Sequence, residues 1–238
     1  MPISAVPDHV AVAVSDRVAA EVRWVDQLGG RPTSWYRNPS FRSNQYRYRG
    51  GAKLELLSPS AGDPSPGNFV RHYLARFGPQ IHHVTLKVPD LEVAIAQLAE
   101  AGFDAVDVNL SDEHWKESFL RPSQIGGLVV QVAWAAHTDV EWAEKRGLSP
   151  EEPPADGGQL VGLHLRHPDL DRARFVWSTL GASVDEIGGE LVCRWGDAPL
   201  SVAISRGERA GPVALRFRGL TAGLPHDDVS GAAVEAVR

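Results

Sequence analysis

The sequence predicts an α+β protein of paired βαβββ modules, with one complete two-module domain and a degenerate second domain. Residues 7–16 and 79–90 each hold a histidine, an alternating apolar run and a closing aspartate. The histidines, His9 and His83, are 74 residues apart, and so are the two aspartates. A period this long indicates a duplicated supersecondary unit rather than a solenoid repeat. A third copy of the strand and its aspartate, over 160–169, predicts the second domain.

The first module is predicted as a strand, a helix and two or three further strands. Residues 8–14 alternate as a half-buried strand does, and Asp16 is a suitable N-cap for a helix through about Leu28. The two glycines after Leu28 end that helix. Irregular strands are expected over 33–49, and a short strand over 53–58 contains Glu55.

The second module repeats this order after a linking segment. A loop over 58–67 and a helix over 68–77 precede it, because the first is rich in Ser, Pro and Gly and the second has helical apolar spacing. The module itself is expected to contain a strand at 83–88, a helix at 91–101, strand candidates at 103–108 and 118–121, and a closing strand at 128–134.

The chain is expected to divide into a domain at 1–134, a linker at 135–158 and a second domain at 159–238. The linker prediction rests on its polar, proline-bearing composition. In the second domain we expect a strand at 160–167, a helix at 170–180, strands at 191–195, 200–205 and 212–218, and a short helix or frayed end at 232–238.

The second domain is predicted to lack a metal site. Alignment on the helix-capping aspartates places Gly162 opposite His9, and the later strands place Ser201 opposite Glu55 and Pro212 opposite His83. None of these three residues is a usual metal ligand. We therefore expect residues 159–238 to serve packing or dimerisation, so a homodimer is a possible assembly.

Bulk composition excludes several classes of protein. A net charge of −6 over 238 residues argues against a general nucleic-acid binder, which needs a basic face. The single cysteine, Cys193, excludes an internal disulfide and favours a reducing, cytoplasmic compartment. No signal peptide and no apolar run long enough to span a membrane are expected. The expected partner is a small molecule.

Four residues share one register across the two modules. Glu55 follows His9 by 46 residues, and Gln131 follows His83 by 48 residues. Imidazole nitrogens with carboxylate and amide oxygens suit one divalent ion such as Co, Ni, Mn, Zn or Fe. A single strand histidine is usually structural, but two matched copies favour a metal site built from His9, Glu55, His83 and Gln131.

Several segments resemble the vicinal oxygen chelate superfamily (glyoxalase, bleomycin resistance, dioxygenase), and methylmalonyl-CoA epimerase-like and glyoxalase-like proteins most closely. The resemblance covers about residues 7–134. It is carried by DHVAVAVSD (8–16), KLELLSPS (53–60), SPGNFVRHYLARFGPQIHHVTLKVPDL (65–91) and GGLVVQVAW (126–134). It implies a glyoxalase-like fold whose paired modules form a metal cleft, with the four residues above at the ligand positions. Successive strand residues face opposite ways, so the register selects His83 rather than His82.

The resemblance implies that the metal stabilises an enolate while a base moves the adjacent proton. That chemistry covers epimerases, isomerases and lyases of the glyoxalase type. The family's usual carboxylate is replaced by Gln131, which is not a base. Glu55 must then act as both ligand and base, or one of Glu113, His114 and Glu117 must serve. We interpret the segment that holds those three, 111–118, as a solvated loop in preference to a catalytic one.

An arginine- and tyrosine-rich segment is predicted to lie at the cleft wall. Arg37, Arg42, Arg47 and Arg49, together with Tyr46, are candidate substrate-binding residues. Guanidinium groups bind carboxylates and phosphates, so the substrate is expected to be anionic. An ordinary solvated strand face explains the same residues equally well.

Two other functions stay open. An iron-dependent extradiol-type dioxygenase uses two histidines and a carboxylate, but Gln131 and Glu55 reverse the placement that the resemblance implies. A non-catalytic binding or resistance protein often lacks metal ligands, whereas this chain has a full set.

Overall fold

The protein is described here by a computed structural model, which describes residues 1–60, 68–148 and 151–238. Much of the predicted loop at 58–67 therefore lies outside the described residues. The chain forms two compact units, each from three segments: the first unit contains Met1–His9, His83–Thr138 and Gly162–Val213, and the second contains Val10–His82, Asp139–Val161 and Ala214–Arg238.

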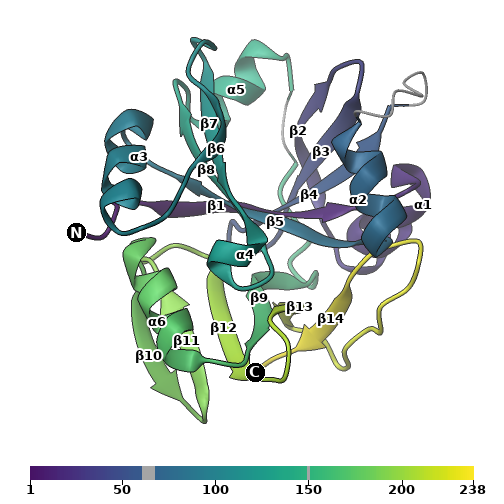
Figure 1. Cartoon of the computed structure of the whole chain (residues 1–238). Helices are drawn as coiled ribbons and strands as arrows, with labels where there is room; N and C mark the ends of the chain where they lie inside the picture. The colour runs from purple at the N-terminus through teal and green to yellow at the C-terminus, as the bar shows by residue number, and fades with distance from the viewer. Residues whose placement is uncertain (61–67, 149–150) are drawn as a thin grey trace. The chain divides into compact units, whose positions relative to one another are not determined.

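The strands form two sheets (Figure 1). The eight-stranded sheet has the order β2-β3-β4-β1-β5-β8-β7-β6 and comprises β1 Val6–Ala13, β2 Arg31–Arg37, β3 Phe41–Arg47, β4 Lys53–Pro59, β5 Gln80–Lys87, β6 Val106–Asn109, β7 Trp115–Leu120 and β8 Val129–Ala135. The six-stranded sheet has the order β10-β11-β12-β9-β13-β14 and comprises β9 Gln159–His167, β10 Ser183–Ile187, β11 Glu190–Arg194, β12 Ser201–Arg206, β13 Gly211–Arg218 and β14 Ala233–Ala236.

The first unit holds most of two βαβββ modules with one topology. In the β5–β8 module, β5 pairs parallel with β8, and β8, β7 and β6 follow antiparallel. In the β9–β12 module, β9 pairs parallel with β12, and β12, β11 and β10 follow antiparallel. The α+β class with βαβββ modules and a glyoxalase-like fold is therefore confirmed.

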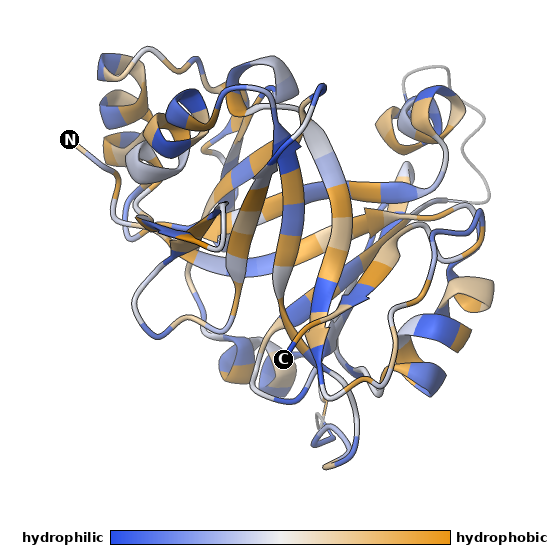
Figure 2. Ribbon diagram, turned by 90° about the horizontal axis from the view of Figure 1, so that it is seen from below, coloured by the Kyte–Doolittle hydropathy of each residue, from blue (hydrophilic) through white to orange (hydrophobic). Residues whose placement is uncertain are grey.

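Each crossover helix of these modules is fixed by the same local chemistry. Asp90 caps α3 (Leu91–Glu100) by accepting from the Val93 amide at 3.0 Å, and Asp169 caps α6 (Leu170–Thr179) in the same way. The apolar faces of both helices are buried. The strands alternate between apolar and polar positions along their length (Figure 2), as one covered face requires. The short α4 (Pro122–Ile125) joins β7 to β8.

The second unit contains the antiparallel β2, β3 and β4 with the helices α1 (Arg17–Glu21), α2 (Phe69–Phe77) and α5 (Asp139–Lys145). Asp16 caps α1 as predicted, accepting from the amides of Val18 and Ala19. The predicted continuous α-helix is wrong beyond Glu21, because η1 (Val22–Gln27) is a π-helix. Its wider turn lets the Trp24 indole donate to the Ser230 carbonyl at 2.8 Å while neighbouring Arg23 reaches the carbonyl of Ala232.

Three further elements differ from the sequence predictions. The predicted helix or frayed end at 232–238 is wrong over β14, which pairs parallel with β13 and buries Val234. The pairing overrides the helical preference of the alanines there. The strand β10 was not predicted, because its side chains are mostly exposed and lack a clear alternation. The helix α5 lies within the predicted linker.

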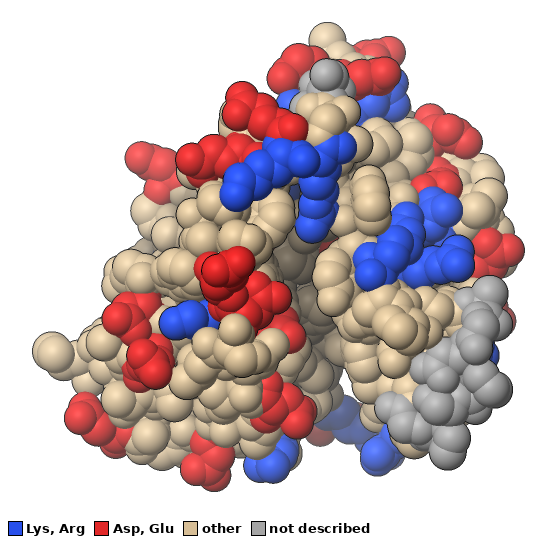
Figure 3. All heavy atoms as spheres, turned by 90° about the horizontal axis from the view of Figure 1, so that it is seen from above, with Lys and Arg blue, Asp and Glu red and all other residues tan. Residues whose placement is uncertain are grey.

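Acidic and basic side chains are both spread over the face seen in Figure 3. Among the described residues, none of the helices has the length and apolar character needed to cross a membrane.

Candidate metal centre

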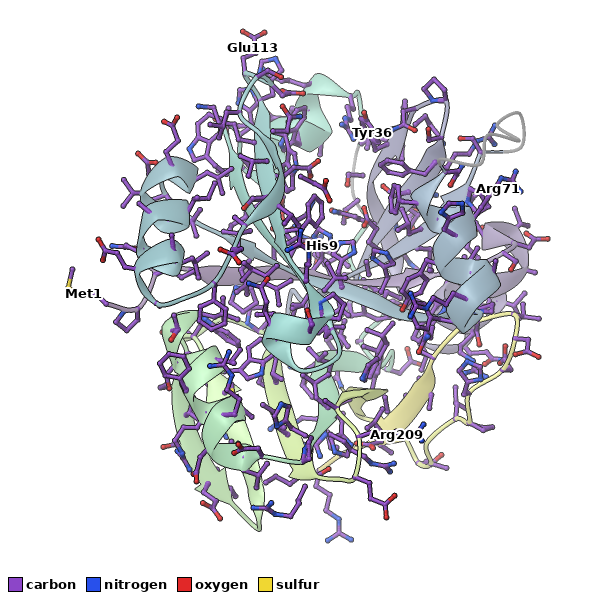
Figure 4. All side chains as sticks on the ribbon, in the orientation of Figure 1. Met1, His9, Tyr36, Arg71, Glu113 and Arg209 are labelled. Atoms are coloured by element: carbon purple, nitrogen blue, oxygen red, sulfur yellow. The ribbon has the colours of Figure 1, made fainter. Side chains whose placement is uncertain are left out.

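The structure brings three of the four predicted ligands together. His9 on β1, Glu55 on β4 and His83 on β5 offer ligand atoms that all lie within 4.8 Å of one another. Both histidines are buried, and their ring centroids are 5.7 Å apart. His9 lies in the interior in Figure 4. No other such group occurs within the described part of the chain. Their role as ligands stays a prediction, but their proximity is what the repeat register requires.

The neighbouring His82 points to the opposite side of β5. Its ring packs against Tyr73 with a centroid distance of 4.4 Å and against Phe69 at 5.9 Å. Burial lowers the pKa of His82 to about 4, although the charge of Glu55 opposes the shift. A neutral imidazole in an aromatic contact is a packing residue, which agrees with the choice of His83 over His82.

A carboxylate fixes the orientation of His9. The Asp8 Oδ2 atom lies 2.6 Å from His9 Nδ1, and its Oδ1 atom lies 2.8 Å from the Lys87 ammonium. Because an ionised carboxylate can only accept, the proton of a neutral His9 is held on Nδ1. The lone pair of Nε2 is then directed away from Asp8. This arrangement is the one that metal-binding histidines use, with a carboxylate on the non-ligating nitrogen.

Gln131 joins this group through hydrogen bonds. The Thr85 hydroxyl lies 3.0 Å from His9 Nε2 and donates to Gln131 Oε1 at 2.5 Å. The Gln131 amide nitrogen in turn donates to Glu117 Oε2 at 2.6 Å, and the Trp115 indole donates to the same oxygen at 2.9 Å. The strand register explains the proximity, because Thr85 pairs with Gln131 and both side chains project from one face.

The donor set fits a divalent ion. The single proton of the Thr85 hydroxyl is directed at Gln131, so a lone pair of the hydroxyl faces His9 Nε2. A proton or a cation on Nε2 makes this contact favourable, because either one is attracted by that lone pair. Two imidazoles, a carboxylate and an amide oxygen suit a borderline ion such as Zn, Mn, Co, Ni or Fe.

The interpretation of 111–118 as a solvated loop is wrong for its second half. Glu117 lies on β7, and its partners Gln131 and Trp115 lie on β8 and β7. Asp112 starts that strand by accepting from the amides of His114 and Trp115. The alternation of Trp115, Glu117 and Phe119 was the signal that could have predicted the strand.

The other two candidate bases of that segment are exposed. The side chain of Glu113 is 86% exposed, and that of His114 is 45% exposed. Glu113 lies at the tip of the β6–β7 hairpin and points away from His9 (Figure 4). Of the three alternatives, Glu117 is bonded to a residue of the predicted site, Gln131.

The predicted substrate-binding arginines fall on two faces of β2–β4. Gln45 pairs with Glu55 and Arg47 with Lys53, so the Arg47 side chain lies on the face of Glu55. Arg42, which pairs with Ser58 and with Arg37, lies on the opposite face together with Tyr46. Which of them contacts a substrate stays a prediction, and the register favours Arg47.

The hydrogen bonds and ion pairs of the predicted substrate-binding residues agree with their division between two faces of the sheet. Arg37 donates to the Ser43 carbonyl at 2.6 Å, and the buried Tyr46 hydroxyl bonds to Glu21, with burial as the main cause of its raised pKa. Arg49 follows β3 and is exposed. Arg47 pairs with the exposed Glu152 at 2.9 Å, and its buried Nε has no hydrogen-bond partner among the described residues.

Comparison with solved structures gives the same fold. The chain is similar to a mutant of 4-hydroxymandelate synthase from Streptomyces coelicolor (14% identity, 92% of this chain, 71% of that chain, TM-score 0.63). It is also similar to methylmalonyl-CoA epimerase from Mycobacterium tuberculosis (22%, 58% and 93%, TM-score 0.51). A third similar structure is the Mn(II)-bound glyoxalase from Novosphingobium aromaticivorans (13%, 93% and 67%, TM-score 0.57).

The comparison with curated proteins found no match. A family model does match, over residues 8–119, and its description is the Glyoxalase/Bleomycin resistance protein/Dioxygenase superfamily. The match spans the strands of His9, Glu55 and His83 and ends on β7. This match confirms the predicted resemblance to that superfamily over residues 8–119.

Proposed function

We propose that the protein is a divalent-metal-dependent epimerase, isomerase or lyase that acts through an enolate on a small, oxygenated, anionic substrate. The observation that carries this proposal is the hydrogen bond from Gln131 to Glu117, because it links a carboxylate to the predicted metal site. The sequence alone named Glu55 as the base, with Glu113, His114 and Glu117 as alternatives, since Gln131 cannot act as one.

His9, Glu55 and His83 are the proposed ligands, and Gln131 is the proposed fourth, through the second lone pair of its Oε1 atom. A divalent ion bound there would polarise a substrate carbonyl and stabilise the negative charge that develops on its oxygen. Asp8 holds His9 in the tautomer that such binding needs.

Glu117 is the proposed general base. Its Oε2 atom accepts from Gln131 and from the Trp115 indole, which fixes the direction of the carboxylate while leaving lone pairs on Oε1. A positioned carboxylate of this kind can remove the proton next to a polarised carbonyl. Glu55 remains a second proposed acid–base group, as the sequence predicted, and two such groups would serve an epimerase.

Arg47 is the proposed contact for the anionic part of the substrate. It lies on the face of Glu55, and its buried Nε offers a donor. A carboxylate or phosphate that displaced the exposed Glu152 would gain a charge-assisted pair.

The proposal is tested by exchange of a substrate's α-proton with D2O, followed by NMR, over a panel of 2-substituted carboxylates and acyl thioesters with Mn²⁺, Co²⁺ or Zn²⁺. We expect one class to exchange, with loss of about 10²- to 10⁴-fold in rate for Glu117→Gln and unchanged metal content. Glu113→Gln is the matched control on the exposed hairpin. Exchange that survives Glu117→Gln would contradict the base, and tight binding without any exchange would indicate a binding protein.

A second function has one observation in its favour. His9, His83 and Glu55 form a two-histidine, one-carboxylate group, which is the ligand set of many non-haem iron oxygenases. We therefore propose iron-dependent dioxygenase activity as the alternative. Oxygen consumption by the ferrous protein with catechols would support it, and exchange of an α-proton without oxygen uptake would exclude it.

We also propose that residues 159–238 form a metal-free domain, with the boundaries predicted from the sequence. We propose a homodimer and a cytoplasmic location as well, and both proposals rest on the sequence alone.

A further inference from the structure

We infer that Thr85 is a positioning residue that couples a cation on His9 to the placement of the base Glu117. The inference rests on the proposed function, and it concerns a residue that is not itself a proposed ligand or base. Its basis is the unbroken hydrogen-bonded series from Asp8 through His9, Thr85 and Gln131 to Glu117.

Thr85 is placed to make both contacts with one atom. Its side chain is fully buried, and its hydroxyl lies 3.0 Å from His9 Nε2 and 2.5 Å from Gln131 Oε1. It projects from β5 on the same face as Gln131 on the paired β8. A hydroxyl has one proton and two lone pairs, so it can donate to only one of these neighbours at a time.

Glu117, at the end of the series, determines the direction of the hydrogen bond between Thr85 and Gln131. Glu117 is a carboxylate that already accepts from the Trp115 indole, so Gln131 must present its amide nitrogen to it. The Gln131 carbonyl oxygen therefore faces Thr85 and needs a donor. The Thr85 hydroxyl proton supplies that donor at 2.5 Å.

The state of His9 Nε2 decides whether that proton is available. When Nε2 carries neither a proton nor a cation, it competes with Gln131 for the Thr85 proton, because both are acceptors. When a cation covers the lone pair, the competition ends and the proton goes to Gln131. A buried acceptor that loses its donor costs on the order of 1–3 kcal/mol, so the orientation of the Gln131 amide depends on the occupancy of Nε2.

The consequence is ordered assembly of the site. A cation on His9 fixes the Thr85 hydroxyl, the hydroxyl fixes Gln131, and Gln131 fixes the Glu117 carboxylate. Glu117 then has Gln131 as a second fixed donor, beside the Trp115 indole, when the metal that polarises the substrate is bound. A merely space-filling Thr85 would be replaced without effect by valine, which has nearly the same shape and no hydroxyl.

The experiment follows the indole N–H resonance of Trp115 by ¹⁵N NMR during titration with Zn²⁺, since that N–H donates to Glu117. Trp115→Phe assigns the signal. The internal control is the Trp195 indole, which donates to the Leu180 carbonyl at 2.9 Å in the β9–β12 module. Thr85→Val removes the hydroxyl, and Thr85→Ser keeps it.

We expect Zn²⁺ to shift the Trp115 signal in the unsubstituted protein and in Thr85→Ser, and to leave the Trp195 signal in place. In Thr85→Val, we expect zinc to bind still and the shift of the Trp115 signal to be lost. The kcat for α-proton exchange should fall about 10- to 100-fold, which is an ordinary loss for a misplaced acid–base group. The KM should stay within about twofold of the unsubstituted protein's value. Thr85→Ala provides the same comparison if the valine variant does not fold.

An equal Trp115 shift in Thr85→Val and in the unsubstituted protein would overturn the inference while leaving the proposed metal site intact. The failure of the unsubstituted protein to bind any divalent ion would overturn the proposed function, and the inference with it. A double variant, Thr85→Val with Glu117→Gln, should be no slower than Glu117→Gln alone, because both changes act on one group.

Discussion

The β5–β8 and β9–β12 modules have the same backbone plan and different chemistry. In both, the first strand pairs parallel with the last and a capped helix crosses between them. Thr85 opposes Gln131 in one module, and His164 opposes Ala203 at the matching positions of the other. The site is therefore a property of side chains placed on a reused frame, as fold and function are separable in general.

The β9–β12 module does carry polar residues on that face, but they contact one another. His164 Nε2 lies 2.8 Å from the Ser205 hydroxyl and 3.7 Å from Glu190. Glu190 precedes Leu191, which pairs with Ile204, and so occupies a position on β11 like that of Glu117 on β7. The modules also differ in the first strand. His83 lies seven residues before the capping Asp90, and Gly162 holds the same position relative to Asp169.

The largest predicted effect belongs to Gly162. It has φ +154°, and a Cβ atom there would lie 2.0 Å from the Ser201 carbonyl oxygen. Gly162→Ala should lower the free energy of unfolding by about 3 kcal/mol or more, since strain and overpacking add. Gly188→Ala, with φ +61° and open space, is the control, with an expected loss of about 1–2 kcal/mol. Equal losses in urea denaturation would contradict the close approach of these strands.

The next effect concerns the carboxylate behind His9. Asp8→Asn removes the charge that holds the Nδ1 proton, and no equivalent acid exists in the β9–β12 module, where Val161 precedes Gly162. Metal affinity should fall about 10- to 100-fold, the usual cost of losing such a partner. Chelator competition measures it, with exposed Asp185→Asn as the control. An unchanged affinity would remove Asp8 from the account of the site.

A smaller effect is expected for His164→Ala. The change removes the bond to Ser205 and leaves that hydroxyl without this partner, so stability should fall by about 1 kcal/mol. Metal content should not change, because His164 belongs to the metal-free module. Urea denaturation and metal analysis on one preparation give both values. Loss of the metal in this variant would break the distinction between the modules.

The smallest predicted effect on stability belongs to Asp227, an acid with a purely structural role. Burial favours the protonated form of Asp227, but bonds from Ser230 and Val229 and the charge of Arg23 outweigh it and lower its pKa to about 2. Because the folded pKa is below the unfolded value, Asp227 stabilises the fold above about pH 4, and this contribution is lost as the pH falls towards 2.

Asp227→Asn should therefore be less stable than the unsubstituted protein at pH 6, by on the order of 0.5 kcal/mol, since the side chain is 40% exposed and solvent screens the pair. The difference should shrink between pH 4 and pH 2 in urea denaturation. A difference that stays constant with pH would show that the carboxylate charge is not the stabilising feature.

The sequence predicted the βαβββ modules and the proximity of His9 and His83, because the repeat fixes both. The matched spacing of His9 and His83 indicated two modules, and strand alternation separated His83 from His82. Glu117 was named as one of three alternative bases, but the charges in 111–118 favoured a solvated loop over the strand β7. The π-helix at Val22–Gln27 depends on contacts with residues about 200 positions away, and no local pattern predicts those.

The sequence also could not predict on which face of the sheet each arginine of the arginine-rich segment lies. The register shifts between Pro32 and Ser34 on β2, and such an irregularity exchanges the faces of the residues that follow it. Counting along β2 would place Arg37 on the face of Arg31, and only its pairing with Arg42 places it on the opposite face.

The central claim is that one divalent ion binds at His9, Glu55 and His83 and that none binds in the β9–β12 module. Its most direct test is metal stoichiometry, by mass spectrometry of the purified protein after loading and gel filtration. The account predicts one ion per chain, lost in His9→Ala and in His83→Ala and kept in His164→Ala. Retention of the ion in both of the first two variants, or its loss only in His164→Ala, would contradict the account.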